Sequence, residues 1–256
     1  MKKRYLIIGS VLLVYVIMMI IIFGTDLFKN KTYIMIGADE KLKYEHGEYV
    51  DIKDSEKSLY QGQNFDIYDE TGHLGIYQLK YHQGRWHAFA DDYSFVKLTE
   101  PIFAIKSNKK YSVPTYSVGN LNSEDIKVLN SMLKEEGITN YNLMLNQKIM
   151  IDLDNDGKNE SLYSVSNLFE DEGADGYFSL VYYVKNDKVK ILKKKIVGLD
   201  DAYDSEQYYL TKLIDLKNDK KLEIVVTRTC YSLSCDDCSE IYTWKWGNYK
   251  KLRTCE

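Results

Sequence analysis

The chain has 256 residues, 34 of them Lys or Arg and 38 Asp or Glu, which gives a formal net charge of −4. The basic residues are scattered among the acidic ones and form no basic stripe, so the composition argues against nucleic acid as a partner. The 23 tyrosines, many beside Val, Ile, Leu and Thr, and the scarcity of proline, with 2 residues, favour β-strands. We therefore expect a mainly β protein.

An apolar segment follows the basic N-terminus. Tyr5 to Phe23 contains no charged residue, and a helix of this length spans about 29 Å, close to the roughly 30 Å hydrocarbon core of a bilayer. No small-x-small cleavage motif follows it, so we expect an uncleaved transmembrane signal anchor within residues 1–25. Lys2, Lys3 and Arg4 predict a cytoplasmic N-terminus in the cell membrane, with the rest of the chain outside.

Residues 26–119 are expected to form a β-rich domain. Its clearest part is a meander of three short strands whose turns contain Gly72 and Gly84, since glycine-bearing turns between alternating apolar runs are typical of hairpins. The meander is expected over residues 64–68, 73–81 and 85–90, with further strands at 33–36, 94–98 and 102–105.

The last part of the chain, residues 120–256, is expected to begin with one amphipathic helix. Asn122 or Ser123 is suited to cap its N-terminus, and apolar residues then recur at helical spacing. Gly137 stands where a helix commonly ends.

An internal repeat follows the helix. A constant offset of 63 pairs Asp152 with Asp215, Asp156 with Asp219 and Glu160 with Glu223. Each acidic loop is followed by a strand and a hairpin, with turns expected at 186–187 and 247–248. Counting the strand that enters the loop, we expect four antiparallel strands in each unit.

The first acidic loop has the pattern of a calcium site. Positions 1, 3, 5 and 9 are carboxylates, and position 6 is a glycine; the carboxylates are Asp152, Asp154, Asp156 and Glu160. Carboxylates held this close repel one another until a cation lies among them, so we expect one structural Ca²⁺ ion. An EF-hand would need Glu at position 12, where Tyr163 stands. An acidic β-turn without metal is the competing interpretation.

The string Asp152 to Glu160, placed between two apolar strands, resembles the calcium loop of FG-GAP and VCBS repeats, the blades of integrin-type β-propellers. The resemblance covers roughly residues 141–255. It implies that Asp152, Asp154, Asp156 and Glu160 supply side-chain oxygens and Lys158 its backbone carbonyl. Lys217 stands at position 3 of the second loop, so we expect no metal there. Two units are too few for a closed propeller, which needs at least about four blades, so we expect two blade-like units in an incomplete, propeller-like arrangement.

All four cysteines lie near the C-terminus: Cys230, Cys235, Cys238 and Cys255. The expected register of the last hairpin brings Cys255 beside Cys238, with Cys230 close to both. Outside the cytoplasm an even number of cysteines predicts disulfides. A structural zinc site is the alternative, because C-x2-C is a zinc half-site.

The sequence contains no nucleophile elbow, zinc-protease motif or phosphate-binding loop, so we do not expect an enzyme. Our hypothesis is a membrane-anchored extracytoplasmic binding module with a structural calcium loop and an unidentified protein or glycan ligand. The alternative is a surface hydrolase that acts on polysaccharide or peptide through two acidic clusters, although such clusters are usually just solvated. The clusters are Glu170, Asp171, Glu172 and Asp175, and Asp200, Asp201 and Asp204.

Overall fold

A computed structural model describes residues 32–36, 40–45, 48–69, 72–82, 85–89, 95–97, 103–107, 111, 114–167, 173–200, 206–231 and 236–253. The predicted anchor, Tyr5 to Phe23, lies outside these residues. Among the residues described, no helix is both long enough and apolar enough to cross a membrane. The described part of the chain is mainly β, as predicted, and its strands form three antiparallel sheets.

The N-terminal sheet has eight strands: β1 (Tyr33–Ile36), β2 (Glu40–Glu45), β3 (Glu48–Asp51), β4 (Asn64–Asp69), β5 (Gly72–His82), β6 (Arg85–Phe89), β7 (Phe95–Lys97) and β8 (Phe103–Lys106). Their order is β3-β2-β1-β8-β4-β5-β6-β7, which confirms the predicted meander β4-β5-β6. A 3-10 helix, η1 (Asp54–Leu59), joins β3 to β4. After it, the buried hydroxyl of Tyr60 donates to the carbonyls of Ile34 (3.0 Å) and Leu42 (2.7 Å).

Two further sheets correspond to the two repeat units. The first repeat sheet consists of β9 (Val118–Gly119), β10 (Leu145–Ile151), β11 (Glu160–Ser166), β12 (Tyr177–Lys185) and β13 (Lys188–Val197). The second repeat sheet consists of β14 (Glu206–Ile214), β15 (Glu223–Cys230), β16 (Cys238–Lys245) and β17 (Asn248–Arg253). The strand orders are β13-β12-β11-β10-β9 and β14-β15-β16-β17, so each sheet contains the four antiparallel strands that the repeat predicts.

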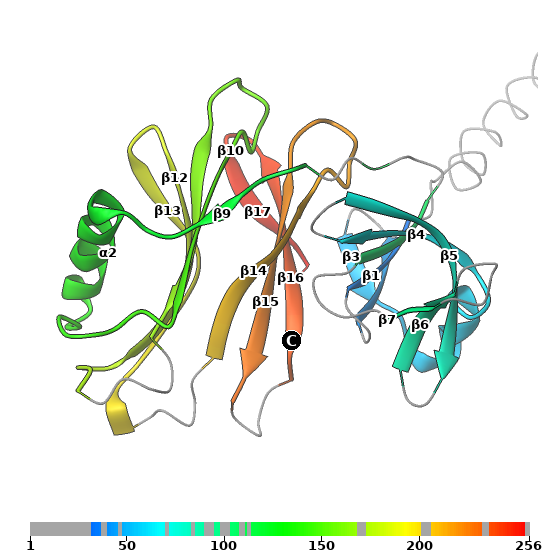
Figure 1. The fold of residues 1–256 in the computed structure, drawn as a ribbon, viewed down its shortest axis with the longest axis horizontal. Helices are drawn as coiled ribbons and strands as arrows, with labels where there is room; N and C mark the ends of the chain where they lie inside the picture. Colours follow the sequence, from blue (N-terminus) through cyan, green and yellow to red (C-terminus); the bar gives the residue numbers. More distant parts are fainter. Residues whose placement is uncertain are drawn as a thin grey trace, which may run out of the picture.

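The sheets and helix α2 (Ser123–Glu135) stack in four layers: α2, the first repeat sheet, the second repeat sheet and the N-terminal sheet (Figure 1). Successive side chains of a strand point to opposite faces of its sheet. On β15, Ile224 therefore packs toward the first repeat sheet and Val225 toward the N-terminal sheet. On β11, Leu162 packs toward the second repeat sheet and Tyr163 toward α2. Each repeat sheet thus buries residues on both of its faces.

The described residues form no propeller, which corrects the propeller-like arrangement that we expected. In a propeller the blades stand side by side around a central channel, so each blade is covered by other blades. Here α2 covers the outer face of the first repeat sheet, and the N-terminal sheet covers the outer face of the second. The two units pack on each other, and α2 and the N-terminal sheet form the two outer layers.

The last hairpin turns one residue earlier than predicted. Lys245 pairs with Asn248, so the turn consists of Trp246 and Gly247, with φ values of 54° and 77°. The register aligns Trp244 with Tyr249, whose ring centroids are 5.2 Å apart in an edge-to-face contact. A cross-strand aromatic pair of this kind stabilises a hairpin. The register that it fixes places Trp246 in the turn with a positive φ, although tryptophan prefers negative φ.

Helix α2 begins as predicted. The side chain of Asn122 accepts hydrogen bonds from the backbone N–H groups of Glu124 and Asp125, both at 3.0 Å. Gly137, with φ of 82°, follows the end of the helix. Both ends of α2 are therefore fixed by the residues that the sequence pattern indicates.

Asp125 ties α2 to the first repeat sheet. Its carboxylate accepts two hydrogen bonds from Lys148 Nζ (2.9 and 2.7 Å) and one from the hydroxyl of Tyr163 (2.6 Å). Burial raises the pKa of Asp125, but the hydrogen bonds from Lys148 and Tyr163 outweigh it, and the pKa lies below its ordinary value. The carboxylate is therefore ionised and holds one helix and two strands together.

We predict that Asp125→Ala lowers the free energy of unfolding by about 2 kcal/mol, because Lys148 and Tyr163 lose their shared acceptor in a largely buried place. Denaturant unfolding measures the change. Lys127→Ala is the matched control, since it removes a solvent-exposed ion pair with Glu124 (2.7 Å) on the same helix, worth at most about 0.5 kcal/mol. Equal losses in the two variants would contradict the prediction.

Candidate functional site

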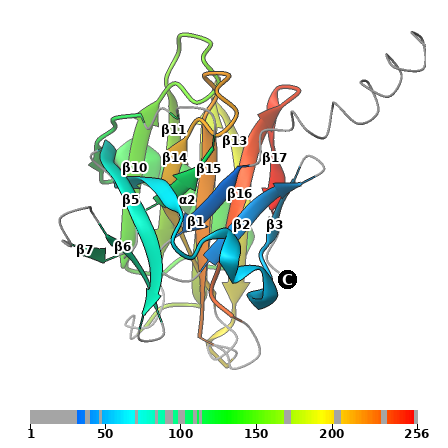
Figure 2. The same ribbon diagram turned by 90° about the vertical axis from the view of Figure 1, so that its right-hand side faces the viewer.

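The two acidic loops lie together at one end of the stack. The first loop (Asp152 to Glu160) joins β10 to β11, and the second loop (Asp215 to Glu223) joins β14 to β15. Both project at the same end as the turns of the β12-β13 and β16-β17 hairpins (Figures 1 and 2). The N–H of Leu222 donates to the carbonyl of Leu153 at 2.9 Å. The hydroxyl of Tyr249 donates to the carbonyl of Leu222 at 2.8 Å and to the carbonyl of Leu153 at 3.4 Å.

The two loops make the same backbone hydrogen bonds. The aspartate at position 1 accepts the N–H groups of positions 5 and 6, at 3.1 and 2.8 Å for Asp152 and at 3.0 and 2.9 Å for Asp215. The aspartate at position 5 accepts the N–H of position 7, at 2.9 Å for Asp156 and 3.0 Å for Asp219. These bonds fix each loop from within.

The end of each loop is also held in the same way. The glutamate at position 9 accepts the N–H of position 2, at 2.9 Å for Glu160 and 2.7 Å for Glu223. Position 6 has positive φ in both loops, 85° for Gly157 and 67° for Lys220. Glycine meets this requirement without strain, whereas a lysine does not. The second loop therefore keeps the fold of the first despite its altered sequence.

Three of the five predicted calcium ligands converge in the first loop. Asp152, Asp154 and Asp156 each place one carboxylate oxygen within 4.8 Å of the others. Glu160 is buried, with 3% of its surface exposed. The backbone N–H of Lys158 donates to Asp156 at 2.9 Å, and the use of its carbonyl as a ligand stays a prediction.

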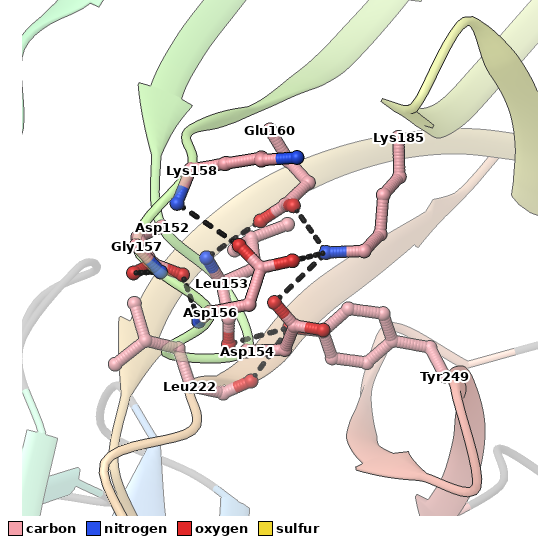
Figure 3. Close-up of polar contacts among 10 residues, drawn as sticks. All are labelled: Asp152, Leu153, Asp154, Asp156, Gly157, Lys158, Glu160, Lys185, Leu222 and Tyr249. Atoms are coloured by element: carbon pink, nitrogen blue, oxygen red, sulfur yellow. Dashed lines mark hydrogen bonds and ion pairs between the residues drawn. The ribbon is translucent and has the colours of Figure 1, made fainter.

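A lysine from the neighbouring strand lies among these carboxylates (Figure 3). Nζ of Lys185, the last residue of β12, is 2.9 Å from Asp154 Oδ1, 2.8 Å from Asp156 Oδ2 and 2.6 Å from Glu160 Oε1. Burial lowers the pKa of Lys185, but its hydrogen bonds to the three carboxylates outweigh it, so the pKa lies well above its ordinary value. The hydrogen bond from Lys185 also lowers the pKa of Asp156. At neutral pH the site therefore holds the Lys185 ammonium beside an ionised Asp156.

The second loop has a lysine of its own. Lys217 Nζ lies 3.9 Å from Glu223 Oε1 and donates to Thr243 Oγ1 at 2.5 Å. The hydroxyl of Thr243 in turn donates to Glu223 Oε1 at 2.7 Å. Glu223 is only 1% exposed, and burial raises its pKa to about 7. Glu223 therefore changes its charge near neutral pH.

Sequence pattern alone does not single out Lys185, because it lies on a strand far from the loop along the chain. The signal that identifies it is the register of the sheets. Ser161 pairs with Val184, and its repeat equivalent Ile224 pairs with Tyr242. The next residues, Lys185 and Thr243, therefore occupy equivalent positions beside the two loops.

Two of the four cysteines are among the described residues. Cys230 ends β15 and Cys238 begins β16, the neighbouring strand. Neither is a free thiol. Cys235 and Cys255 lie outside the described residues, so the pairing of the four cysteines in two disulfides stays a prediction.

Of the acidic residues in the hydrolase hypothesis, Asp175 holds two chain segments together. Its Oδ2 accepts the backbone N–H and the hydroxyl of Thr139 (3.0 and 2.7 Å) and the backbone N–H of Asn140 (2.9 Å). These hydrogen bonds lower the pKa of Asp175. Asp200 is described as well, while Glu170, Asp171, Glu172, Asp201 and Asp204 lie outside the described residues.

No protein-family model matches the chain, and neither a curated protein nor a solved structure matches it. The resemblance to FG-GAP and VCBS calcium loops therefore rests on the first loop alone.

We predict that Glu223 makes the protein less stable as pH rises through neutrality. Burial raises the pKa of Glu223 from an ordinary value of 4.5 to about 7. Between these two pH values the folded state therefore binds a proton that the unfolded state lacks. This contribution is fully present below the unfolded pKa and is lost as pH rises through the folded pKa. Between pH 5 and 8 the free energy of unfolding should fall by about 2 kcal/mol.

Denaturant unfolding of Glu223→Gln across this range tests the assignment, since the variant should lose most of the slope. Glu240→Gln is the control. Glu240 is also buried on the second repeat sheet, and burial alone would raise its pKa. The hydrogen bonds and charges of Tyr242, Lys193 and Lys251 outweigh this effect, so the pKa of Glu240 lies below its ordinary value. An unchanged slope in Glu223→Gln would show that another group titrates.

We also predict that the four cysteines form two disulfides. A disulfide that closes a loop of about 25 residues adds roughly 3 to 4 kcal/mol in the chain-entropy model, so a reductant should lower the melting temperature. A variant with all four cysteines changed to serine is the control and should not respond. Four titratable thiols in protein isolated without reductant, or bound zinc, would refute the disulfides.

Proposed function

We propose that the protein is a membrane-anchored, extracytoplasmic β-rich module that binds a protein or glycan ligand, and that its first loop binds one structural calcium ion. The observation that carries the calcium proposal is the convergence of carboxylate oxygens from Asp152, Asp154 and Asp156 within 4.8 Å. Calcium prefers hard oxygen ligands in flexible, highly charged loops. The ion would neutralise these carboxylates and hold β10 to β11.

The donor set fits such an ion. Asp152, Asp156 and Glu160 are each oriented by a backbone N–H. An ionised carboxylate has about four acceptor positions, so these bonds leave positions for a cation. In the second loop Lys217 stands at position 3 in place of a carboxylate, which supports the proposal that this loop takes no metal.

The loop end of the stack is the proposed ligand-binding end. Trp246 is 87% exposed at the tip of the β16-β17 hairpin and has a positive φ of 54°. Nζ of Lys245 lies 4.7 Å from its ring centroid. A strained, exposed tryptophan adds nothing to the core, and such residues are frequent anchors in binding surfaces. The flat ring suits stacking on a sugar or an apolar side chain.

We predict that the wild-type chain binds one calcium ion with a dissociation constant of about 10⁻⁴ to 10⁻³ M, as extracellular calcium modules do. A few millimolar calcium should then add roughly 1 to 2 kcal/mol of stability. Asp154→Ala removes a ligand and should abolish most of this gain. Calorimetric titration of the 256-residue chain in mild detergent, with melting temperature in parallel, measures both effects.

Asp219→Ala is the matched control for this experiment. Asp219 makes the same type of backbone hydrogen bond in the second loop (3.0 Å), so its loss reports on loop stability without changing the calcium response. A wild-type chain that neither binds calcium nor melts higher with it would leave the first loop an acidic turn without metal.

A further inference from the structure

Each loop has one lysine ammonium beside its buried glutamate, but the lysine comes from a different position. In the first loop, position 3 is Asp154 and the lysine is Lys185 on the adjacent hairpin strand. In the second loop, position 3 is itself Lys217. The hairpin position equivalent to Lys185 is occupied there by Thr243, which bonds to both the lysine and the glutamate.

The buried glutamates explain why a cation is needed in both loops. Glu160 and Glu223 are 3% and 1% exposed, and each uses one oxygen to accept the N–H of position 2. A carboxylate removed from water is strongly destabilised unless a positive charge or hydrogen bonds compensate it. In both loops the remaining oxygen, Oε1, is the one that faces the lysine.

We propose that the Lys185 ammonium is the resident cation of the first loop, as the Lys217 ammonium is of the second. The first loop then keeps its fold without a metal ion. A consequence that rests on the proposed function is that calcium enters only in exchange for Lys185, whose competition weakens calcium binding. The ring centroid of Trp244 lies 5.4 Å from Lys185 Nζ, so the ammonium also makes a cation–π contact while it lies among the carboxylates.

The test transplants the arrangement of the second loop into the first. The variants are Asp154→Lys, Lys185→Thr and the double variant, compared with the wild-type 256-residue chain in a chelating buffer. Lys185→Thr leaves the carboxylates without a cation, and Asp154→Lys brings two ammonium groups together. Each single variant should lower the melting temperature by about 5 °C. The double variant should lie closer to the wild type than either single variant does, because one lysine again faces Glu160.

Calcium titration of the same proteins tests the exchange. Lys185→Thr should bind calcium about tenfold more tightly than the wild type, a difference of about 1.4 kcal/mol, and the double variant should not bind it. Additive losses of melting temperature in the double variant would overturn the resident role of Lys185. If the losses are non-additive but neither the wild type nor Lys185→Thr binds calcium, the resident ammonium stands and the proposed calcium site fails.

Discussion

Burial of the face that the two repeat sheets share is the constraint on which the rest of the structure depends. Leu162 from one sheet and Ile224 from the other belong to a single apolar cluster, and this contact leaves each sheet with one uncovered apolar face. The chain covers one with α2 and the other with the N-terminal sheet. In a propeller, further blades would bury these faces. Here α2 and the N-terminal sheet, which are not part of the repeat, bury them instead.

The same packing creates the electrostatic problem at the loop end. Because the sheets are in contact, the residues that begin β11 and β15 are buried, and in both strands this residue is a glutamate, Glu160 and Glu223. A backbone N–H satisfies one oxygen of each carboxylate. The other oxygen needs a positive charge or a further donor. Lys185 Nζ lies 2.6 Å from Glu160, whereas Lys217 Nζ lies 3.9 Å from Glu223. Burial raises the pKa of Glu223 to about 7, although hydrogen bonds from Thr243 and Leu216 and the charge of Lys217 act to lower it.

Local features were predictable from the sequence, and long-range ones were not. Turn glycines and alternating apolar residues predict the meander β4-β5-β6, and Asn122 predicts the start of α2, because these signals act over a few residues. The insertion of β8 between β1 and β4 depends on pairings distant along the chain. The turn at Trp246 and Gly247 follows from the pairing of Trp244 with Tyr249 and replaces the turn at 247–248 that the local sequence predicts. Lys185 is found only once the register of β11 and β12 is known.

The origin of each lysine decides what the two loops can do. Lys217 is part of its own loop, and its ammonium is linked to Glu223 through the hydroxyl of Thr243. Lys185 comes from the adjacent strand, and its flexible stem of four carbons lets the ammonium leave the carboxylates without any change in the loop backbone. That backbone is held by its own hydrogen bonds, such as those to Asp152. In our proposal the first loop can therefore exchange its resident ammonium for another cation, whereas the second loop has its own lysine alone.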